Sequence, residues 1–325
     1  LDDFIESNNY VRVVFVAHSM GGLVSSKYLA KGQEQRAIVE KHISIGTPYL
    51  GSTLPIPIFF NGRFLEGFIG IGQEILSSEA VKIILPNIQT IYSLLPSKNH
   101  FKPYVNYGKF ELNEFGYPQY TIEGTYNTFD DTMNYYKDLS GWNTALAIKS
   151  SDDLSNLFIN GKHITSFVDS YYIVGSDRAT TQSIDLIKNA NSVGFRSCVQ
   201  HKTNAGDGTV SLWSATIGNT ANANNIYYKL PGISEKESEH TEMVIGKESY
   251  GTINFITSLI KGVGQNYDEQ KLNSYFNITQ STPSLSMEYL AESVNNTQIQ
   301  QIADISVDKK STHSLFNSQK MQLKN

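Results

Sequence analysis

The chain has 325 residues, of which 40% are hydrophobic and 18% charged, so it fits one large α/β domain or a domain with an appendage and cannot be disordered throughout. Its net charge of −5 argues against nucleic-acid binding through a basic surface. The single cysteine, Cys198, excludes an intramolecular disulfide and a cysteine zinc cluster, and no apolar run reaches the length of a membrane span.

The first fifty residues have the pattern of a βαβ unit. Residues 1–10 are typical of a helix end and a polar turn, and Val11–Val16 is a β-branched run of the kind buried on both faces of a parallel sheet. Gly21–Lys31 predicts a helix that stops at Gly32, and His42–Ile45 predicts a second strand. This spacing requires parallel pairing, so we expect an α/β fold with a mostly parallel sheet flanked by helices.

Residues 52–168 lack strand–helix alternation, and we interpret them as a cap inserted between two strands of the sheet. The region opens with an apolar stretch punctuated by Gly and Pro, LPIPIFFNGRFLEGFIGIG, and a helical segment is expected near Glu74–Leu85. Two interpretations of the apolar side chains stay open. Either they form a lid that opens an acyl-chain groove at a lipid surface, or they pack the cap onto the sheet.

The sheet pattern resumes at Tyr171–Val174 and at Ile226–Leu230, and a last helix is predicted over Thr252–Lys261. These elements complete a first domain over residues 1–262. Residues 263–325 are polar and rich in Ser, Asn, Gln and Thr. We expect them to form a linker or the start of a truncated C-terminal module.

The strongest motif is AHSMGG at residues 17–22, between the first predicted strand and the first long helix. It matches the G-x-S-x-G nucleophile elbow with alanine in the first glycine position. Ser19 would sit at the strained tip, and the small residues at 17 and 21 would leave room for the backbone. The helix N-terminus and the Met20 backbone N–H could then stabilise an oxyanion. His18 adjoins Ser19 on the turn, so we expect it to pack or line the site rather than act as the base.

A serine of ordinary pKa needs a base, and the base needs a carboxylate that fixes its tautomer. The chain order in this kind of fold is Ser, then Asp or Glu, then His, which leaves Asp177 and Asp207 as competing acids. Asp207 lies between two glycines, a pattern that by itself is equally typical of a plain turn. His240 follows the last predicted strand and precedes the last helix, where the base belongs. The other histidines fit this order or context less well: His42, His100, His163, His201 and His313.

Four stretches make the chain resemble the lecithin:cholesterol acyltransferase-like group of α/β-hydrolases, including bacterial lipase-like members. They are AHSMGG at 17–22, SIGTPYLGS at 44–52, IYSLLPS at 91–97 and GDGTVSLWSA at 206–215. The resemblance spans residues 1–262 and implies an α/β-hydrolase fold with an inserted cap. It favours Asp207 over Asp177 as the acid. It also implies that Ser19 is the nucleophile, that Asp207 orients the base, and that His240 acts as base and then as acid.

The chain departs from the family pattern in three places. Ala17 replaces a glycine, and Ser211 stands where the family commonly has proline. The elbow motif begins soon after Leu1, so we expect the first strands, and the loop with the second oxyanion donor, to be missing from the chain. We therefore expect this chain to be poorly active, since one lost donor costs about 100- to 1,000-fold in rate. Its first predicted strand would also present an unpaired apolar edge.

Together these residues predict a serine-dependent acyl-ester hydrolase that forms an acyl-enzyme on lipid-like or phospholipid-like esters and contacts a lipid surface through the cap. The alternatives are an O-acyltransferase that passes the acyl group to an alcohol, and a non-catalytic binding or surface module. No cofactor, metal site or nucleic-acid partner is predicted. The compartment stays open, because one cysteine suits a secreted or cell-surface protein of a Gram-positive bacterium as well as a cytoplasmic protein.

Overall fold

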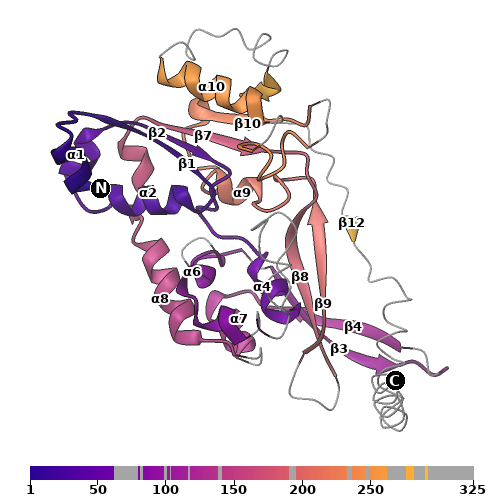
Figure 1. Cartoon of the computed structure of the whole chain (residues 1–325). Coiled ribbons are helices and arrows are strands. Elements are labelled where there is room, and N and C mark those ends of the chain that lie inside the picture. Colours follow the sequence, from indigo (N-terminus) through magenta and orange to yellow (C-terminus); the bar gives the residue numbers. More distant parts are fainter. Residues whose placement is uncertain are drawn as a thin grey trace, which may run out of the picture.

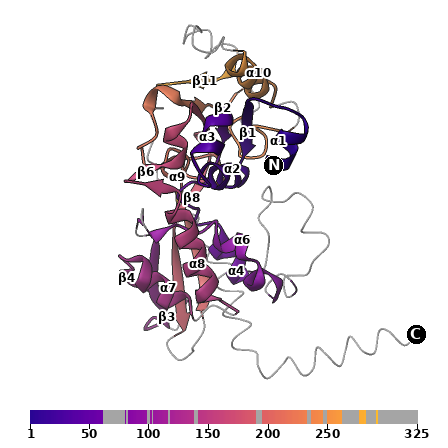
Figure 2. The same cartoon turned by 90° about the vertical axis from the view of Figure 1, so that its left-hand side faces the viewer.

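The computed structural model shows two lobes, each built on a five-stranded sheet (Figure 1). It describes residues 1–61, 80, 83–98, 101–102, 104–115, 118–137, 141–189, 195–232, 236–245, 249–261, 276–281 and 290–291. The first sheet lies in the upper half of Figure 1 and the second in the lower half, and Figure 2 shows the same division from a view turned by 90°.

Four parallel strands and one short antiparallel strand form the first sheet, in the order β1-β2-β7-β10-β11. The strands are β1 (Val13–His18), β2 (Val39–Ile45), β7 (Ser170–Gly175), β10 (Ile226–Lys229) and β11 (Ile278–Thr279). The helices of this lobe are α1 (Asp2–Ser7), α2 (Gly21–Leu29), α3 (Gln33–Ile38), α9 (Leu212–Ala215) and α10 (Tyr250–Ile260), with the 3₁₀ turn η4 (Ala223–Asn225). Every strand and helix predicted for this lobe has an observed counterpart within a few residues. The predicted α/β class with a mostly parallel sheet is confirmed.

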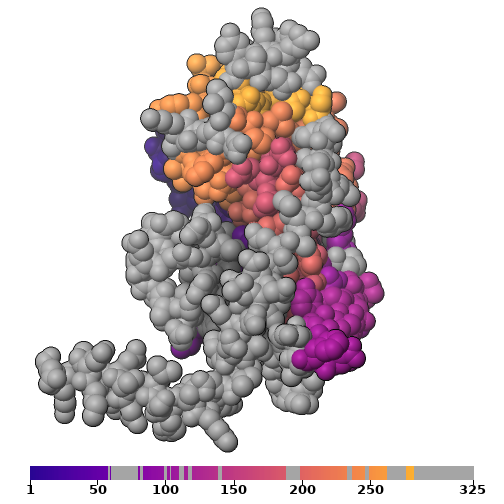
Figure 3. Space-filling view, turned by 90° about the vertical axis from the view of Figure 1, so that its right-hand side faces the viewer, coloured from indigo at the N-terminus to yellow at the C-terminus, as the bar shows by residue number. Residues whose placement is uncertain are grey.

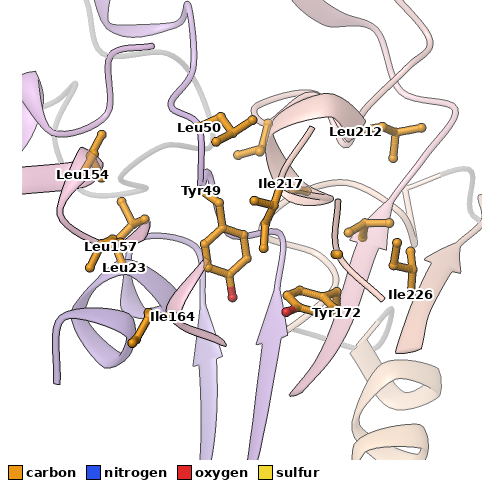
Figure 4. Packing of buried hydrophobic residues seen from close by; sticks show 14 of the residues in the cluster. Leu23, Tyr49, Leu50, Leu154, Leu157, Ile164, Tyr172, Leu212, Ile217 and Ile226 are labelled. Atoms are coloured by element: carbon orange, nitrogen blue, oxygen red, sulfur yellow. The ribbon is translucent and has the colours of Figure 1, made fainter. Parts of the chain in front are cut away.

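Alternate side chains along β7 face opposite sides of the first sheet, as the two-residue period of a strand requires. Tyr171 and Ile173 belong to the apolar cluster that includes residues of α10, whereas Tyr172 and Val174 belong to the cluster that includes residues of α2 and α9. Figure 4 shows Leu23 of α2 and Tyr172 within this second cluster. Helices therefore cover both faces, with α10 on one side of the sheet and α2 on the other (Figure 1).

The first strand is an edge of this sheet and not an internal strand. Among the described strands, β1 pairs with β2 alone, which agrees with the unpaired apolar edge expected from the sequence. Val16 of β1 is 49% exposed, and Val11, just before the strand, is 82% exposed. The prediction of a run buried on both faces is therefore wrong here. The β-branched residues correctly indicated a strand, but burial also depends on which elements cover each face, and a local pattern does not report them.

The second sheet combines strands from separate stretches of the chain, in the order β12-β9-β8-β3-β4. The strands are β3 (Val105–Leu112), β4 (Pro118–Thr125), β8 (Thr180–Asn189), β9 (Phe195–Thr203) and β12 (Leu290–Ala291). β3 runs parallel to β8, and the other neighbours pair antiparallel. β3 and β4 fall inside the region predicted as a cap, residues 52–168, whereas β8 and β9 follow β7. Figure 3 shows the β3–β4 hairpin at the lower right, apart from the orange segments of the first lobe.

Short helices pack on the second sheet (Figure 2). They are α4 (Pro55–Asn61), α6 (Gln89–Tyr92), α7 (Phe129–Tyr136) and α8 (Thr144–Ser155), with the 3₁₀ turn η1 (Leu85–Asn87). The hairpin of β5 (Phe158–Ile159) and β6 (Lys162–His163) and the 3₁₀ turn η3 (Ile164–Phe167) follow α8 and pack with the first lobe, where Ile164 joins the cluster that contains Leu23. Side-chain caps start two of the helices. Thr128 accepts a hydrogen bond from Asp131 N before α7, and Asn143 accepts one from Leu146 N before α8, and such caps each contribute about 1 kcal/mol.

The apolar stretch at the start of the predicted cap supplies core packing where the structure describes it. Ile56 and Phe59 of α4 are buried in the second lobe together with Tyr92. The Phe59 ring lies 5.2 Å from the Trp142 ring and 5.3 Å from the Tyr92 ring, centre to centre. These contacts support the packing interpretation for α4. The later part of the stretch, and most of the helical segment expected near Glu74–Leu85, lie outside the described residues.

The described part of the chain contains no helix with the length and apolar character needed to cross a bilayer. Of residues 263–325, predicted to be a linker or a truncated module, the structure describes 276–281 and 290–291, which contribute β11 and β12. The limits of the first domain and of the cap stay predictions.

A buried histidine makes the stability of the first lobe depend on pH. His42 of β2 is fully buried, with Nε2 2.8 Å from Ser25 Oγ of α2. Burial lowers the pKa of His42 from 6.5 to about 4, because a charged imidazole is poorly solvated in the core. The unfolded chain therefore takes up a proton near pH 6.5 that the folded chain accepts only near pH 4. The contribution of His42 to the free energy of unfolding is therefore fully present above the pKa of the unfolded chain, and it is lost as the pH falls toward the pKa of the folded chain.

We expect the wild type to lose roughly 3 kcal/mol of unfolding free energy relative to His42→Gln between pH 7 and pH 4, because glutamine does not titrate. Urea unfolding of both proteins at several pH values measures this difference. The carboxylates titrate in both proteins alike, so their effect on the unfolding free energy cancels in the difference. A difference that stays constant over the range would contradict a neutral, buried His42.

Candidate active site

The turn between β1 and α2 holds Ser19 in a strained conformation. β1 ends at His18 and α2 begins at Gly21, so the chain passes from strand to helix within two residues. Ser19 has a φ of 55°, a left-handed value that costs a non-glycine residue about 1–3 kcal/mol and is typical of functional sites. Its backbone N–H donates to Ile45 O at 2.8 Å. The turn is therefore tied to the end of β2.

The close contact that excludes a larger residue from this turn is at Gly22 and not at Gly21. A Cβ on Gly21 would meet Ala17 Cβ at 3.8 Å, an ordinary contact, whereas a Cβ on Gly22 would lie 2.0 Å from Thr47 Oγ1. A methyl group at position 21 would therefore fit against the small Ala17, so the stricter demand for space is at Gly22. The space is required where α2 packs against the turn after β2, a contact between segments that the motif does not contain.

His240 links Ser19 to Asp207 through two short hydrogen bonds. Its Nε2 lies 2.8 Å from Ser19 Oγ, and its Nδ1 lies 2.7 Å from Asp207 Oδ2. Because a carboxylate oxygen accepts, Nδ1 carries the proton and Nε2 is free to accept the serine proton. His240 is 3% exposed and Asp207 is 1% exposed. The structure thus brings together the three side chains that the sequence predicted as nucleophile, base and acid.

The loop around Asp207 orients its carboxylate. Oδ1 accepts hydrogen bonds from Thr209 N at 2.9 Å and Val210 N at 2.7 Å, and the Asp207 N–H donates to Val210 O at 3.2 Å. Gly208 has a φ of 92°, a conformation open to glycine at little cost. The turn that the Gly-Asp-Gly pattern indicated therefore uses one carboxylate oxygen and leaves Oδ2 for the imidazole.

A partly buried ion pair anchors the segment that carries His240. Glu237 Oε2 lies 2.9 Å from Nζ of Lys229, whose side chain is fully buried at the end of β10, and it also accepts from Asn277 Nδ2 at 3.1 Å. Burial lowers the pKa of Lys229, and the neighbouring Glu237 opposes that shift. Removing one partner of a fully buried pair typically costs about 3–5 kcal/mol, and the 21% exposure of the Glu237 side chain makes the cost smaller here. The pair therefore holds the segment three residues before His240 against the sheet.

Gly46, directly after β2, leaves the space that the Asp207–His240 pair occupies. It has a φ of 56°, and a Cβ there would lie 2.9 Å from Asp207 Oδ2 and 3.0 Å from His240 Nδ1. Gly46 belongs to the SIGTPYLGS stretch, whose sequence alone indicates no role for this position. A glycine after a buried strand is also typical of an ordinary strand end, so only the tertiary contact identifies its function.

The competing residues in the described part of the chain do not take part in this hydrogen-bonded line. Asp177 is exposed in the turn after β7, and the structure shows no hydrogen bond from it to His240 in the part of the chain it describes. His201 of β9 lies 2.7 Å from Asp185 in the second lobe. The remaining alternatives are also elsewhere: His42 on β2 and His163 on β6, with His100 and His313 outside the described residues.

The backbone N–H of Met20, at the N-terminus of α2, makes no hydrogen bond with any described residue. It is therefore available to an oxyanion formed next to Ser19.

Burial raises the pKa of Cys198 to about 12, so this thiol is protonated at neutral pH and offers no second nucleophile. Within the described ranges, no three His, Cys, Asp or Glu side chains gather as metal ligands.

The first sheet and the site at its edge have the features of an α/β-hydrolase. The sheet is mostly parallel with helices on both faces, a strained serine lies between strand and helix, and an acid and then a histidine follow it in the chain. The family model for lecithin:cholesterol acyltransferase matches residues 1–210. The chain therefore belongs to this family of lipid-ester hydrolases and acyltransferases, and the resemblance inferred from the sequence is confirmed. The matched range contains Ser19 and Asp207 and ends before His240.

No curated protein matches the chain. Among solved structures, a chain from "The crystal structure of Tle4-Tli4 complex" is similar, with a TM-score of 0.49 and 16% sequence identity. The similarity covers 81% of this chain and 62% of that chain. The protein thus spans less than two thirds of the length of that structural neighbour.

We expect Gly46→Ala to slow labelling of Ser19 by a fluorophosphonate sharply, because the methyl group would push Asp207 and His240 out of line. Gly161→Ala is the matched control, since Gly161 also has a left-handed φ, of 75°, but a Cβ there meets nothing within 4 Å. Both variants should lose about 1 kcal/mol of stability from backbone strain. Equal labelling rates of the two variants would show that Gly46 provides no space the site needs.

Proposed function

We propose that this protein is a serine-dependent acyl-ester hydrolase acting on lipid-like esters, with Ser19 as nucleophile, His240 as base and then acid, and Asp207 as the residue that orients the base. The observation that carries this proposal is the unbroken hydrogen-bonded line from Ser19 Oγ through the His240 ring to Asp207 Oδ2. Its supports are the strained turn at Ser19 and membership of the lecithin:cholesterol acyltransferase family.

The proposed reaction follows from the positions of the protons in this hydrogen-bonded line, with Nδ1 of His240 protonated and Nε2 free to accept. Ser19 Oγ attacks the ester carbonyl carbon while its proton passes to His240 Nε2, and the charge that forms on the carbonyl oxygen is stabilised by the Met20 N–H. The intermediate collapses to an acyl-serine, and the leaving alcohol takes the proton from His240. Water then attacks the acyl-serine and gives a proton to His240, which passes it to Ser19 Oγ as the bond from Ser19 Oγ to the acyl carbon breaks and the carboxylic acid leaves. Asp207 stays ionised and stabilises the imidazolium in both steps.

The acceptor of the acyl group decides between hydrolysis and transfer. The chemistry up to the acyl-serine is the same in both, and an alcohol that replaces water in the second step gives an ester in place of an acid. Family membership favours a lipid-like acyl donor and keeps O-acyltransferase activity as the second candidate. A non-catalytic binding module would not need the aligned hydroxyl, imidazole and carboxylate.

We expect a fluorophosphonate probe to label the wild type at Ser19 and to leave Ser19→Ala unlabelled. Asp207→Asn should slow labelling by roughly 10,000-fold, because an amide donor favours the wrong imidazole tautomer. Asp177→Asn, at the exposed competing aspartate, should label like the wild type. Labelling needs only a nucleophilic Ser19 and is expected even where turnover is slow. Equal labelling of wild type and Ser19→Ala would refute the enzyme and favour a binding module.

We expect hydrolysis of p-nitrophenyl esters to rise with acyl length if the donor is lipid-like, because a longer chain buries more apolar surface, about 0.8 kcal/mol per CH₂. Product analysis with an added long-chain alcohol separates ester formation from hydrolysis. Ser19→Ala gives the background rate for each ester. A rate that does not change with acyl length would contradict the lipid-like substrate while leaving the serine mechanism in place.

A further inference from the structure

His18, the last residue of β1, contacts the proposed base directly. Its Nε2 lies 2.8 Å from the backbone carbonyl oxygen of His240, and the two imidazole rings lie 4.7 Å apart, centre to centre, at an angle of 42°. The two residues are 222 positions apart in the chain. The residue next to the nucleophile therefore touches both the main chain and the ring of the residue that activates it.

This contact fixes the tautomer of His18. A carbonyl oxygen only accepts, so His18 Nε2 must carry a proton and donate it. Burial, and then the nearby His240, lower the pKa of His18, which keeps this ring uncharged at neutral pH. A neutral ring opposes the formation of an imidazolium on His240 far less than a charged ring would.

Both peptide groups of His240 are then held by the other two segments of the site. Its N–H donates to Asp207 O at 2.9 Å, and its C=O accepts from His18 Nε2 at 2.8 Å. The acid loop thus fixes one side of the residue and the nucleophile turn fixes the other. The imidazole projects from a backbone whose position is set relative to Ser19 Oγ.

We propose that His18 is a positioning residue, which holds the carbonyl side of His240 so that the base stays aligned with Ser19 Oγ through both proton transfers. This inference rests on the proposed function, because it assigns a role in the same site. The nucleophile and base come from distant parts of the chain. His18 is adjacent to Ser19 on the turn, so its contact with His240 ties the base to the segment that carries the nucleophile. Misplacement by about 1 Å in such a line can cost 100-fold in rate.

The test compares His18→Phe, which keeps an aromatic ring but removes the donor, with His18→Gln, which keeps a side-chain N–H donor. The rate of fluorophosphonate labelling at Ser19 should fall by about 10- to 100-fold in His18→Phe and recover in His18→Gln. His42→Gln, a change at a buried histidine outside the site, serves as the control for altered stability. It should label like the wild type.

A second readout does not depend on any reaction at Ser19. The proton on His240 Nδ1, seen by NMR, should exchange faster and broaden in His18→Phe, while Ser19→Ala should retain it. Wild-type labelling rate together with a wild-type resonance in His18→Phe would overturn the positioning role. Labelling losses in His18→Phe and His42→Gln that match their losses in melting temperature would overturn it too. Failure of the wild type to label at Ser19 would refute the proposed function instead, and the resonance would still report whether His18 holds His240.

Discussion

The buried hydrogen bond between His240 Nδ1 and Asp207 Oδ2, 2.7 Å long, is the interaction on which the proposed chemistry depends. It sets the tautomer that leaves Nε2 free to accept the proton of Ser19. It forms only because Gly46 leaves the space beside it and because the Asp207 loop satisfies the other carboxylate oxygen. A buried carboxylate with one oxygen unpaired would be costly, so the loop supports the fold and the site together.

The first sheet explains why these groups meet. β1, β2 and β7 run parallel, so their carboxyl ends lie at one edge of the sheet, where ligands bind in open α/β folds. Ser19 follows β1, Gly46 follows β2, and the Asp207 loop packs near the end of β7, where a Cβ on Gly175 would lie 2.6 Å from Asp207 Cβ. The chain order of the three side chains is therefore compatible with one compact site.

Three segments that are far apart in sequence hold His240 in place. Asp207 holds its backbone N–H, His18 holds its carbonyl, and the Lys229–Glu237 pair holds the segment just before it. Each contact is buried or partly buried, where hydrogen bonds and ion pairs are stronger than in water. The strained Ser19 and the burial of the Lys229 ammonium both cost free energy locally, and the packed sheet around them offsets that cost.

The local sequence predicted those parts of the fold that local physics controls. The β-branched run at β1, the helix stop after α2 and the turn at Ser19 follow from backbone preference and side-chain shape, and the motif context pointed to the nucleophile. The second sheet was missed, although Tyr120 and Ile122 of β4 alternate with polar residues. The alternation in β3 changes phase at Gly108, where the register with β4 shifts, so this part of the pattern is broken into short pieces. The pairing of β3 with β8 joins stretches on either side of β7, and no local pattern encodes such a partner.

By itself, the sequence determined the α/β class, the family, and a short set of candidate side chains in the right chain order. Only the tertiary structure decided which carboxylate and which histidine meet at Ser19, that Gly22 and Gly46 are the positions where space is essential, and that His18 contacts the base. The physical reason is that a hydrogen bond depends on distance and direction between groups brought together by folding. Residue type and spacing along the chain specify neither.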